Sequence, residues 1–293
     1  MNDRIENYIA GAGTGYATYN FVKNNFRITF GNPCRNMIKR LIKTEDNIIY
    51  KKAAIKAFKK SELESKGYKI NNVTSKNIET LINEEKKCIR NHLENKFQKV
   101  SKVFGEKVGS FFVNKYTKKI NPSITASYKE TLHGKNAFLN PLTKCININA
   151  EKSPQFIFHE MGHAINRSNS ITRYIANSKK TVRLIPFILA VALLKNKKQE
   201  NEKPQGIIDK TTTFIKDNCG KLATLTFVPL LLDEANASIN AAKMAKPLLE
   251  PKLYKNLNKI NAYAYGTHFT AAMGICLGIY CASKVKDKFT EHK

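Results

Sequence analysis

The sequence predicts a mostly helical α+β protein in which a short β-hairpin comes directly before a helix that carries two histidines. The hairpin is indicated by residues 134–149, where Asn140-Pro141 marks a turn and residues 145–149 alternate apolar with polar. Most of the remaining chain has apolar positions at helical spacing. Three uncharged runs, at 184–194, 222–232 and 262–283, predict apolar helices that could enter a membrane.

The chain divides into three expected regions. Residues 1–43 form an apolar and basic N-terminal segment, residues 44–130 a charged helical region, and residues 131–293 the region with the hairpin, the histidines and the apolar runs. The glycines between Gly11 and Gly15 lack the spacing and the preceding strand of a phosphate-binding loop, so we expect them to allow close packing. In the charged helical region most Lys and Glu side chains are expected to face solvent.

The charge of the chain favours anionic partners. Its formal net charge of +27 suits an acidic lipid surface or a nucleic acid. No zinc finger, RNP-type aromatic box or confined basic helix is present, so we expect anionic membrane lipids and no specific nucleic acid. The six cysteines are scattered without a Cys-x-x-Cys pair, which is typical of reduced thiols in a protein facing the cytosol.

The main chemical signal is a His-Glu-x-x-His pattern at residues 159–163. On a helix, His159 and His163 lie one turn apart and can bind one Zn²⁺, while Glu160 can reach a water on the metal. Ser153 is expected to cap this helix. The alternative is an ordinary helix that carries these side chains by coincidence, which is rare in a chain with six histidines.

A catalytic zinc site takes a third protein ligand, and the best candidate is Glu234. It directly follows the second apolar run, and on a helix it shares a face with Ala237 and Ser238. These small residues would let the second helix approach the first closely. Asp233 is the local alternative, although its side chain would point about 100° away on the same helix. We therefore expect one zinc ion per chain, bound by His159, His163 and Glu234.

The chain resembles the gluzincin metallopeptidases, and most closely the membrane-embedded HtpX-like and CAAX-endopeptidase group. Three features match in order: Asn136-Ala137-Phe138, the His-Glu-x-x-His pattern at 159–163, and Glu-x-x-Ala-x at 234–238. The resemblance implies a zincin-like metallopeptidase core in which Asn136, Ala137 and Phe138 belong to the edge strand that binds substrate. It also implies apolar segments between the two metal-binding helices.

The resemblance further implies a zinc-dependent endopeptidase that acts on protein or peptide substrates, with Glu160 as general base. Where the family usually has Asp four residues after the ligand glutamate, this chain has Ser238, which can hydrogen-bond an imidazole but carries no charge. Tyr263, Tyr265 and His268 are candidates for stabilising an oxyanion, although a histidine in an apolar run is expected to be buried and satisfied by packing.

The apolar runs predict a membrane-associated protein whose active site faces the cytoplasm. The third run, 22 residues long, can span a bilayer, whereas the first two cover about half of one. Those two could be buried helices, a shallow hairpin, or spans extended by Lys and Arg side chains. Two other functions remain open: a non-catalytic, zinc-stabilised membrane scaffold, and a basic lipid- or nucleic-acid-binding protein. A scaffold has no need of Glu160 beside the metal.

Overall fold

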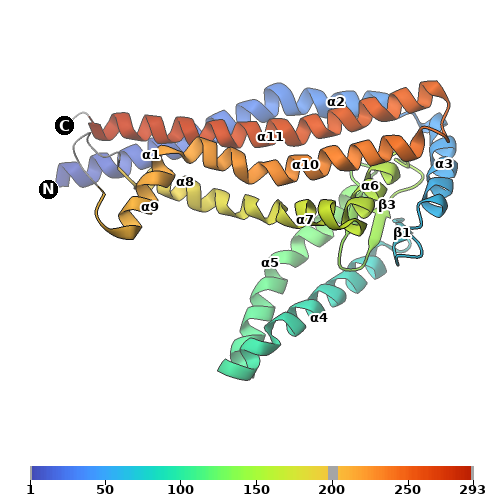
Figure 1. Cartoon of the computed structure of the whole chain (residues 1–293), viewed down its shortest axis with the longest axis horizontal. Helices are drawn as coiled ribbons and strands as arrows, with labels where there is room; N and C mark the ends of the chain where they lie inside the picture. The colour runs from blue at the N-terminus through green and yellow to red at the C-terminus, as the bar shows by residue number, and fades with distance from the viewer. Residues whose placement is uncertain (1, 197–203, 292–293) are drawn as a thin grey trace. The chain divides into compact units, whose positions relative to one another are not determined.

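Helices make up most of the protein, and one small three-stranded sheet precedes the helix that carries the histidine pair (Figure 1). The structure is a computed structural model that describes residues 2–196 and 204–291. The elements in chain order are α1 (Asn2–Phe26), η1 (Arg27–Gly31), α2 (Asn32–Leu41), η2 (Thr44–Asp46), α3 (Asn47–Lys60), β1 (Lys69–Asn72), α4 (Ile78–Phe104), α5 (Glu106–Leu132), β2 (Phe138–Asn140), β3 (Cys145–Ile148), α6 (Phe156–Ser168), α7 (Ser170–Ser178), η3 (Lys179–Leu184), α8 (Ile185–Leu194), α9 (Gly206–Asp217), α10 (Cys219–Ala245) and α11 (Pro251–Glu291). The α+β fold class expected from the sequence is confirmed at this level.

The chain forms two compact units. The helical unit consists of Met1–Leu41, Ser170–Ala235 and Lys259–Lys293, and the sheet unit consists of Ile42–Asn169 and Asn236–Asn258. Helices α10 and α11 contribute residues to both units. The units therefore do not follow the three consecutive regions, 1–43, 44–130 and 131–293, that the sequence suggested.

The sheet has the strand order β1-β3-β2. Strands β2 and β3 pair antiparallel, with Phe138 opposite Asn147, so the predicted hairpin is present. Strand β1 pairs parallel with β3 and was not predicted, because it lies in the region expected to be helical. Successive side chains of β3 point to opposite faces. Ile146 and Ile148 are fully buried in the main hydrophobic core, together with residues of α3 and α6.

Helices α4 and α5 form a long hairpin that leaves the sheet (Figure 1). Its base is fixed by a small apolar cluster that includes Ile82 and Ile124. Beside this cluster, the buried hydroxyl of Tyr128 donates a hydrogen bond to Oε2 of Glu85 at 2.8 Å, and it also lies 3.2 Å from Oδ1 of Asn147. The sheet and the hairpin are therefore joined by a buried polar contact as well as by packing.

In the helical unit, α1 packs closely against α11 through small residues. A Cβ atom on Gly15 would lie 2.9 Å from the carbonyl oxygen of Ala282, and one on Gly278 would lie 3.0 Å from the carbonyl oxygen of Tyr19. The segment Gly11–Gly15 lies inside helix α1. Gly11 and Gly15 allow the expected close packing, whereas a Cβ atom on Gly13 would meet nothing within 4 Å. The helical conformation excludes a phosphate-binding loop there.

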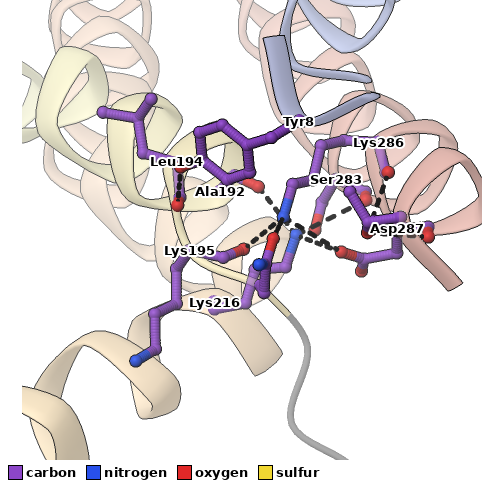
Figure 2. A network of polar contacts seen from close by, with 10 residues as sticks. Tyr8, Ala192, Leu194, Lys195, Lys216, Ser283, Lys286 and Asp287 are labelled. Carbon is purple, nitrogen blue, oxygen red and sulfur yellow. Dashed lines mark hydrogen bonds and ion pairs between the residues drawn. The ribbon is translucent and has the colours of Figure 1, made fainter. Parts of the chain in front are cut away.

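The C-terminal end of α8 is closed by two buried lysines (Figure 2). The last carbonyl groups of a helix have no partner within the helix and need donors from elsewhere. Here Nζ of Lys216 donates to the carbonyl oxygen of Ala192 at 2.7 Å, and Nζ of Lys286 donates to that of Lys195 at 2.9 Å. The two ammonium groups therefore bind carbonyl groups at the C-terminal end of α8.

This lysine pair shares one carboxylate, that of Asp287, which lies 2.8 Å from Nζ of Lys216 (Figure 2). Burial and the neighbouring charge of Lys216 lower the pKa of Lys286 to about 8, while Asp287 opposes that shift. Nζ of Lys286 also lies 5.2 Å from the ring centre of Tyr8. The charged form of Lys286 is thus held at a cost in free energy.

One helix in residues 2–196 and 204–291, α10, is long and apolar enough to cross a membrane. One third of its apolar window, 33%, is buried in the protein. The core helix of a soluble protein can have the same length and composition, so α10 by itself is weak evidence for a membrane. The runs at 184–194 and 262–283 lie in η3–α8 and in α11.

Candidate metal centre

Helix α6 presents both histidines from one side. Phe158 and Met161 are fully buried and anchor the helix in the core. The rings of His159 and His163 lie 4.8 Å apart between their centres and are perpendicular, with an interplanar angle of 90°. The expected cap is wrong: Gln155, not Ser153, precedes the helix, and the side chain of Gln155 forms no capping hydrogen bond. Turn residues before Phe156 start the helix instead.

Helix α10 meets α6 backbone to backbone. A Cβ atom on Gly162 would lie 2.1 Å from the carbonyl oxygen of Ala237, so any side chain at this position would clash with α10. Ala237 and Ala241 are fully buried. Nearby, Nδ2 of Asn240 donates to Oδ1 of Asn166 at 2.9 Å. The predicted close approach of a helix with small residues is therefore present.

This approach brings the three predicted metal ligands together. His159, His163 and Glu234 each offer one ligand atom, and these atoms all lie within 4.8 Å of one another. His163 and Glu234 are buried, and His159 is half-buried. Two imidazole nitrogens and one carboxylate oxygen are donors that zinc prefers. By donor chemistry and spacing, these residues fit a zinc ion, and Glu160 is not part of the group.

Ser238 lies beside one ligand, as expected. Its Oγ is 3.4 Å from Nδ1 of His159. With a hydrogen on Nδ1, the imidazole donates to Ser238 and keeps the lone pair of Nε2 for a metal. The contact fixes the ring orientation but adds no negative charge.

Asp233, the alternative ligand, is bound elsewhere. Its carboxylate is only 1% exposed, and its Oδ2 lies 2.6 Å from Nζ of Lys179 on η3. It is not part of the group that can hold a metal. A buried carboxylate needs such a partner to remain charged. Nothing in the sequence pointed to Lys179, because it lies 54 positions before Asp233.

His268 lies near the metal group and is not buried as its apolar surroundings suggested. Its side chain is 46% exposed, and its Nε2 lies 3.7 Å from Oε2 of Glu234. Of the other two downstream candidates, Tyr265 stacks on Phe269 with 6.4 Å between ring centres. Tyr263 is half-buried. His268 is therefore the candidate that the structure places beside a predicted ligand.

Glu160, the expected base, follows His159 on α6 and is only 8% exposed. Its burial shields the carboxylate from bulk water, which strengthens its interaction with any nearby positive charge. Its carboxylate is not one of the grouped ligand atoms.

The predicted substrate segment lies at the start of an edge strand. Strand β2 begins at Phe138, directly after Asn136 and Ala137, and pairs with β3 on one side. Ala137 is buried in the core, and the ring of Phe138 makes an edge contact with Tyr128, with 5.1 Å between ring centres. Two of the three side chains therefore serve packing. What β2 can offer an extended peptide is its main chain.

Comparison of the chain with protein-family models, with curated proteins and with solved structures found no match.

Proposed function

We propose that the chain is a zinc-dependent endopeptidase of the gluzincin type with a zincin-like core. In this proposal His159, His163 and Glu234 hold one zinc ion per chain. The observation that carries it is that ligand atoms from two helices, separated by 71 positions between His163 and Glu234, lie within 4.8 Å of one another. Ordinary helix packing gives no reason for two imidazoles and a carboxylate to meet there.

When bound, the zinc ion would supply Lewis acidity, which polarises a peptide carbonyl and lowers the pKa of a water molecule. The carboxylate of Glu160 takes a proton from the attacking water and delivers it to the nitrogen of the leaving amine. Ser238 holds the imidazole of His159 in one orientation through Nδ1. His268, close to Glu234, is placed to donate a hydrogen bond to the oxygen of the cleaved carbonyl.

The substrate class follows from the edge strand. Strand β2 has three residues and pairs with β3 on one side, so a peptide could extend the sheet along its other side. Such pairing forms hydrogen bonds with the main chain of the peptide. It aligns a scissile bond and does not require a particular side chain. A protein or peptide substrate bound beside Asn136, Ala137 and Phe138 agrees with this geometry.

A membrane-associated site facing the cytoplasm is part of the proposal. It is supported by the apolar helix α10 and by large exposed apolar side chains on α1, α8 and α10, such as Phe21, Phe187 and Leu225. The net charge of +27 favours contact with anionic lipids. The six free cysteines suit a reducing compartment.

The test is cleavage of an unstructured protein such as casein by metal-replete protein, followed by mass spectrometry of the fragments. Wild type should cleave, Glu160→Gln should lose at least ~100-fold of the rate while keeping its zinc, and Glu151→Gln should match wild type because Glu151 is an exposed surface residue. Equal cleavage by wild type and Glu160→Gln would mean that a contaminating protease acts. Zinc binding without any cleavage across a broad peptide library would favour the non-catalytic scaffold.

A further inference from the structure

The tip of the α4–α5 hairpin exposes a cluster of large apolar side chains. Val103 is 73% exposed, Phe104 is 69% exposed and Phe111 is 59% exposed. They lie on both sides of Gly105, where the chain turns from α4 into α5. We call the segment 96–119 the hairpin tip. Apolar side chains of this size at a solvated helix end lower solubility unless something covers them.

The charge of the hairpin is divided along its length. The hairpin tip carries seven lysines and one glutamate, and all seven lysines are exposed. The rest of the hairpin, residues 78–95 and 120–132, carries five glutamates against four Lys and Arg residues. The hairpin tip thus has an excess of six positive charges, while the rest of the hairpin has none. Positive charge beside exposed apolar side chains indicates an anionic partner with an apolar interior.

Helices α4 and α5 pack closely at the hairpin tip. Gly105 has a φ of +89°, which favours glycine and allows the sharp turn. A Cβ atom on Gly109 would lie 1.8 Å from Oγ of Ser101, so the two helices touch directly behind the turn. The ring of Phe97 stacks on that of Phe112 at 5.5 Å. The exposed side chains therefore project from a closely packed helix turn.

We propose that the hairpin tip inserts into the surface of an anionic lipid bilayer. Val103 and Phe104 would enter the acyl region at the apex, while lysines on both helices reach the lipid phosphates. Each lysine near an anionic membrane adds favourable binding free energy, and the buried apolar side chains add to this. This inference names a surface for the lipid partner that the charge suggests, and it does not depend on the metal centre.

A bilayer suits this surface better than a nucleic acid or an acidic peptide. Single-stranded nucleic acids bind by stacking bases on several aromatic faces. Among the described rings of the hairpin tip, Phe97, Phe111, Phe112 and Tyr116 contact one another, so Phe104 alone could stack a base. A peptide needs a groove or a strand edge to bury its side chains. A convex helix turn offers neither, whereas a fluid bilayer can close around projecting side chains.

The chain contains no tryptophan, so one introduced at the apex is a unique reporter. We would compare full-length Phe104→Trp with a control, Asn91→Trp, at an exposed position of α4 outside the hairpin tip. Each protein is mixed with vesicles of phosphatidylcholine alone or with phosphatidylglycerol added. Tryptophan emission and its quenching by brominated lipids report insertion at that position, whatever other part of the chain binds the vesicle.

The proposal expects a blue shift and bromolipid quenching for Phe104→Trp with anionic vesicles, and neither for Asn91→Trp. Adding Lys99→Glu, Lys102→Glu and Lys107→Glu should weaken the response roughly 100-fold or more in lipid concentration. Emission from Phe104→Trp that stays unshifted with anionic vesicles would overturn the proposal, as would a shift with a single-stranded oligonucleotide alone. Zinc content, measured on the same samples, separates this outcome from a failure of the metal centre.

Discussion

The carbonyl oxygen of Ala237 lies 2.1 Å from the point that a Cβ atom on Gly162 would occupy. Gly162 has no side chain, so α6 can touch α10 at this position. It lies between the two histidines and directly before His163. Ala237 is one turn after Glu234 on α10. The group of three possible metal ligands therefore depends on this backbone contact, and substitutions there should affect metal binding and stability together.

We predict that Gly162→Ala separates the two helices. Relieving the clash requires a backbone shift, which typically costs 1–3 kcal/mol or more, and the ligand atoms move with it. Urea unfolding should show a loss of about 2 kcal/mol or more, and zinc affinity should fall. The matched control is Gly13→Ala, because a Cβ atom at Gly13 has nothing within 4 Å. That change should leave stability equal or raise it by up to ~1 kcal/mol.

We predict that Ser238→Ala weakens zinc binding without unfolding the protein. It removes the contact between Ser238 and Nδ1 of His159, and partners of this kind contribute about 10–100-fold in metal affinity. Ser238→Asp should strengthen binding, because it adds a negative charge at the same position. Competition with a zinc chelator measures both changes. Equal affinities in all three proteins would show that Ser238 does not orient the ligand.

We predict that Tyr128→Phe destabilises the protein by about 1–3 kcal/mol, because it leaves the buried carboxylate of Glu85 without the hydroxyl donor. Burial and the hydrogen bond to Glu85 raise the pKa of Tyr128 far above its usual value, so the hydroxyl keeps its proton throughout the experiment. Tyr116→Phe, at a 45% exposed position of the same helix, is the control and should change the free energy of unfolding by less than ~0.5 kcal/mol.

We predict that the protein becomes more stable as pH rises from about 8 to 9.5. The pKa of Lys286 is about 8 in the folded protein and close to its ordinary 10.5 when unfolded, so the unfolded chain binds more protons in this range. Below pH 8 both states are protonated and the dependence disappears. Lys216 and Asp287 face the same ammonium group, and Tyr8 has a raised pKa and ionises above this range.

The measurement compares urea unfolding at pH 8 and pH 9.5 for wild type and Lys286→Met. The variant should lose the rise in stability, which is at most ~2 kcal/mol between pH 8 and pH 9.5 for a single lysine. Lys288→Met, an exposed lysine on the same helix, should keep it. A rise of the same size in Lys286→Met would assign the pH dependence to another group.

The local parts of the fold were predictable. The alternation at 145–148 and the turn before it predicted the hairpin, because neighbouring strands that pair antiparallel need only a short connection. The small residues after Glu234 predicted the close contact with α6, since helical periodicity places them on one face. The scattered cysteines predicted free thiols, and all six are free.

The long-range parts were not predictable. Strand β1 has the sequence Lys-Ile-Asn-Asn, which has little strand preference, and it forms because β3 offers a parallel partner 76 positions away. Likewise, Lys179 reaches Asp233, and His268 approaches Glu234, only through the packing of separate helices. Ser153 failed as a cap because the turn extends two residues further before α6 begins.

The most direct test of the account is zinc content per chain, measured by elemental analysis on metal-replete wild type, Glu234→Ala, Glu160→Gln and Asp233→Asn. One zinc per chain is expected in wild type, in Glu160→Gln and in Asp233→Asn, and none in Glu234→Ala. Asp233→Asn is the matched control, because Asp233 is next to Glu234 in the sequence but its carboxylate pairs with Lys179. Metal-replete wild type without zinc, or Glu234→Ala that keeps a full equivalent, would contradict the proposed metal centre.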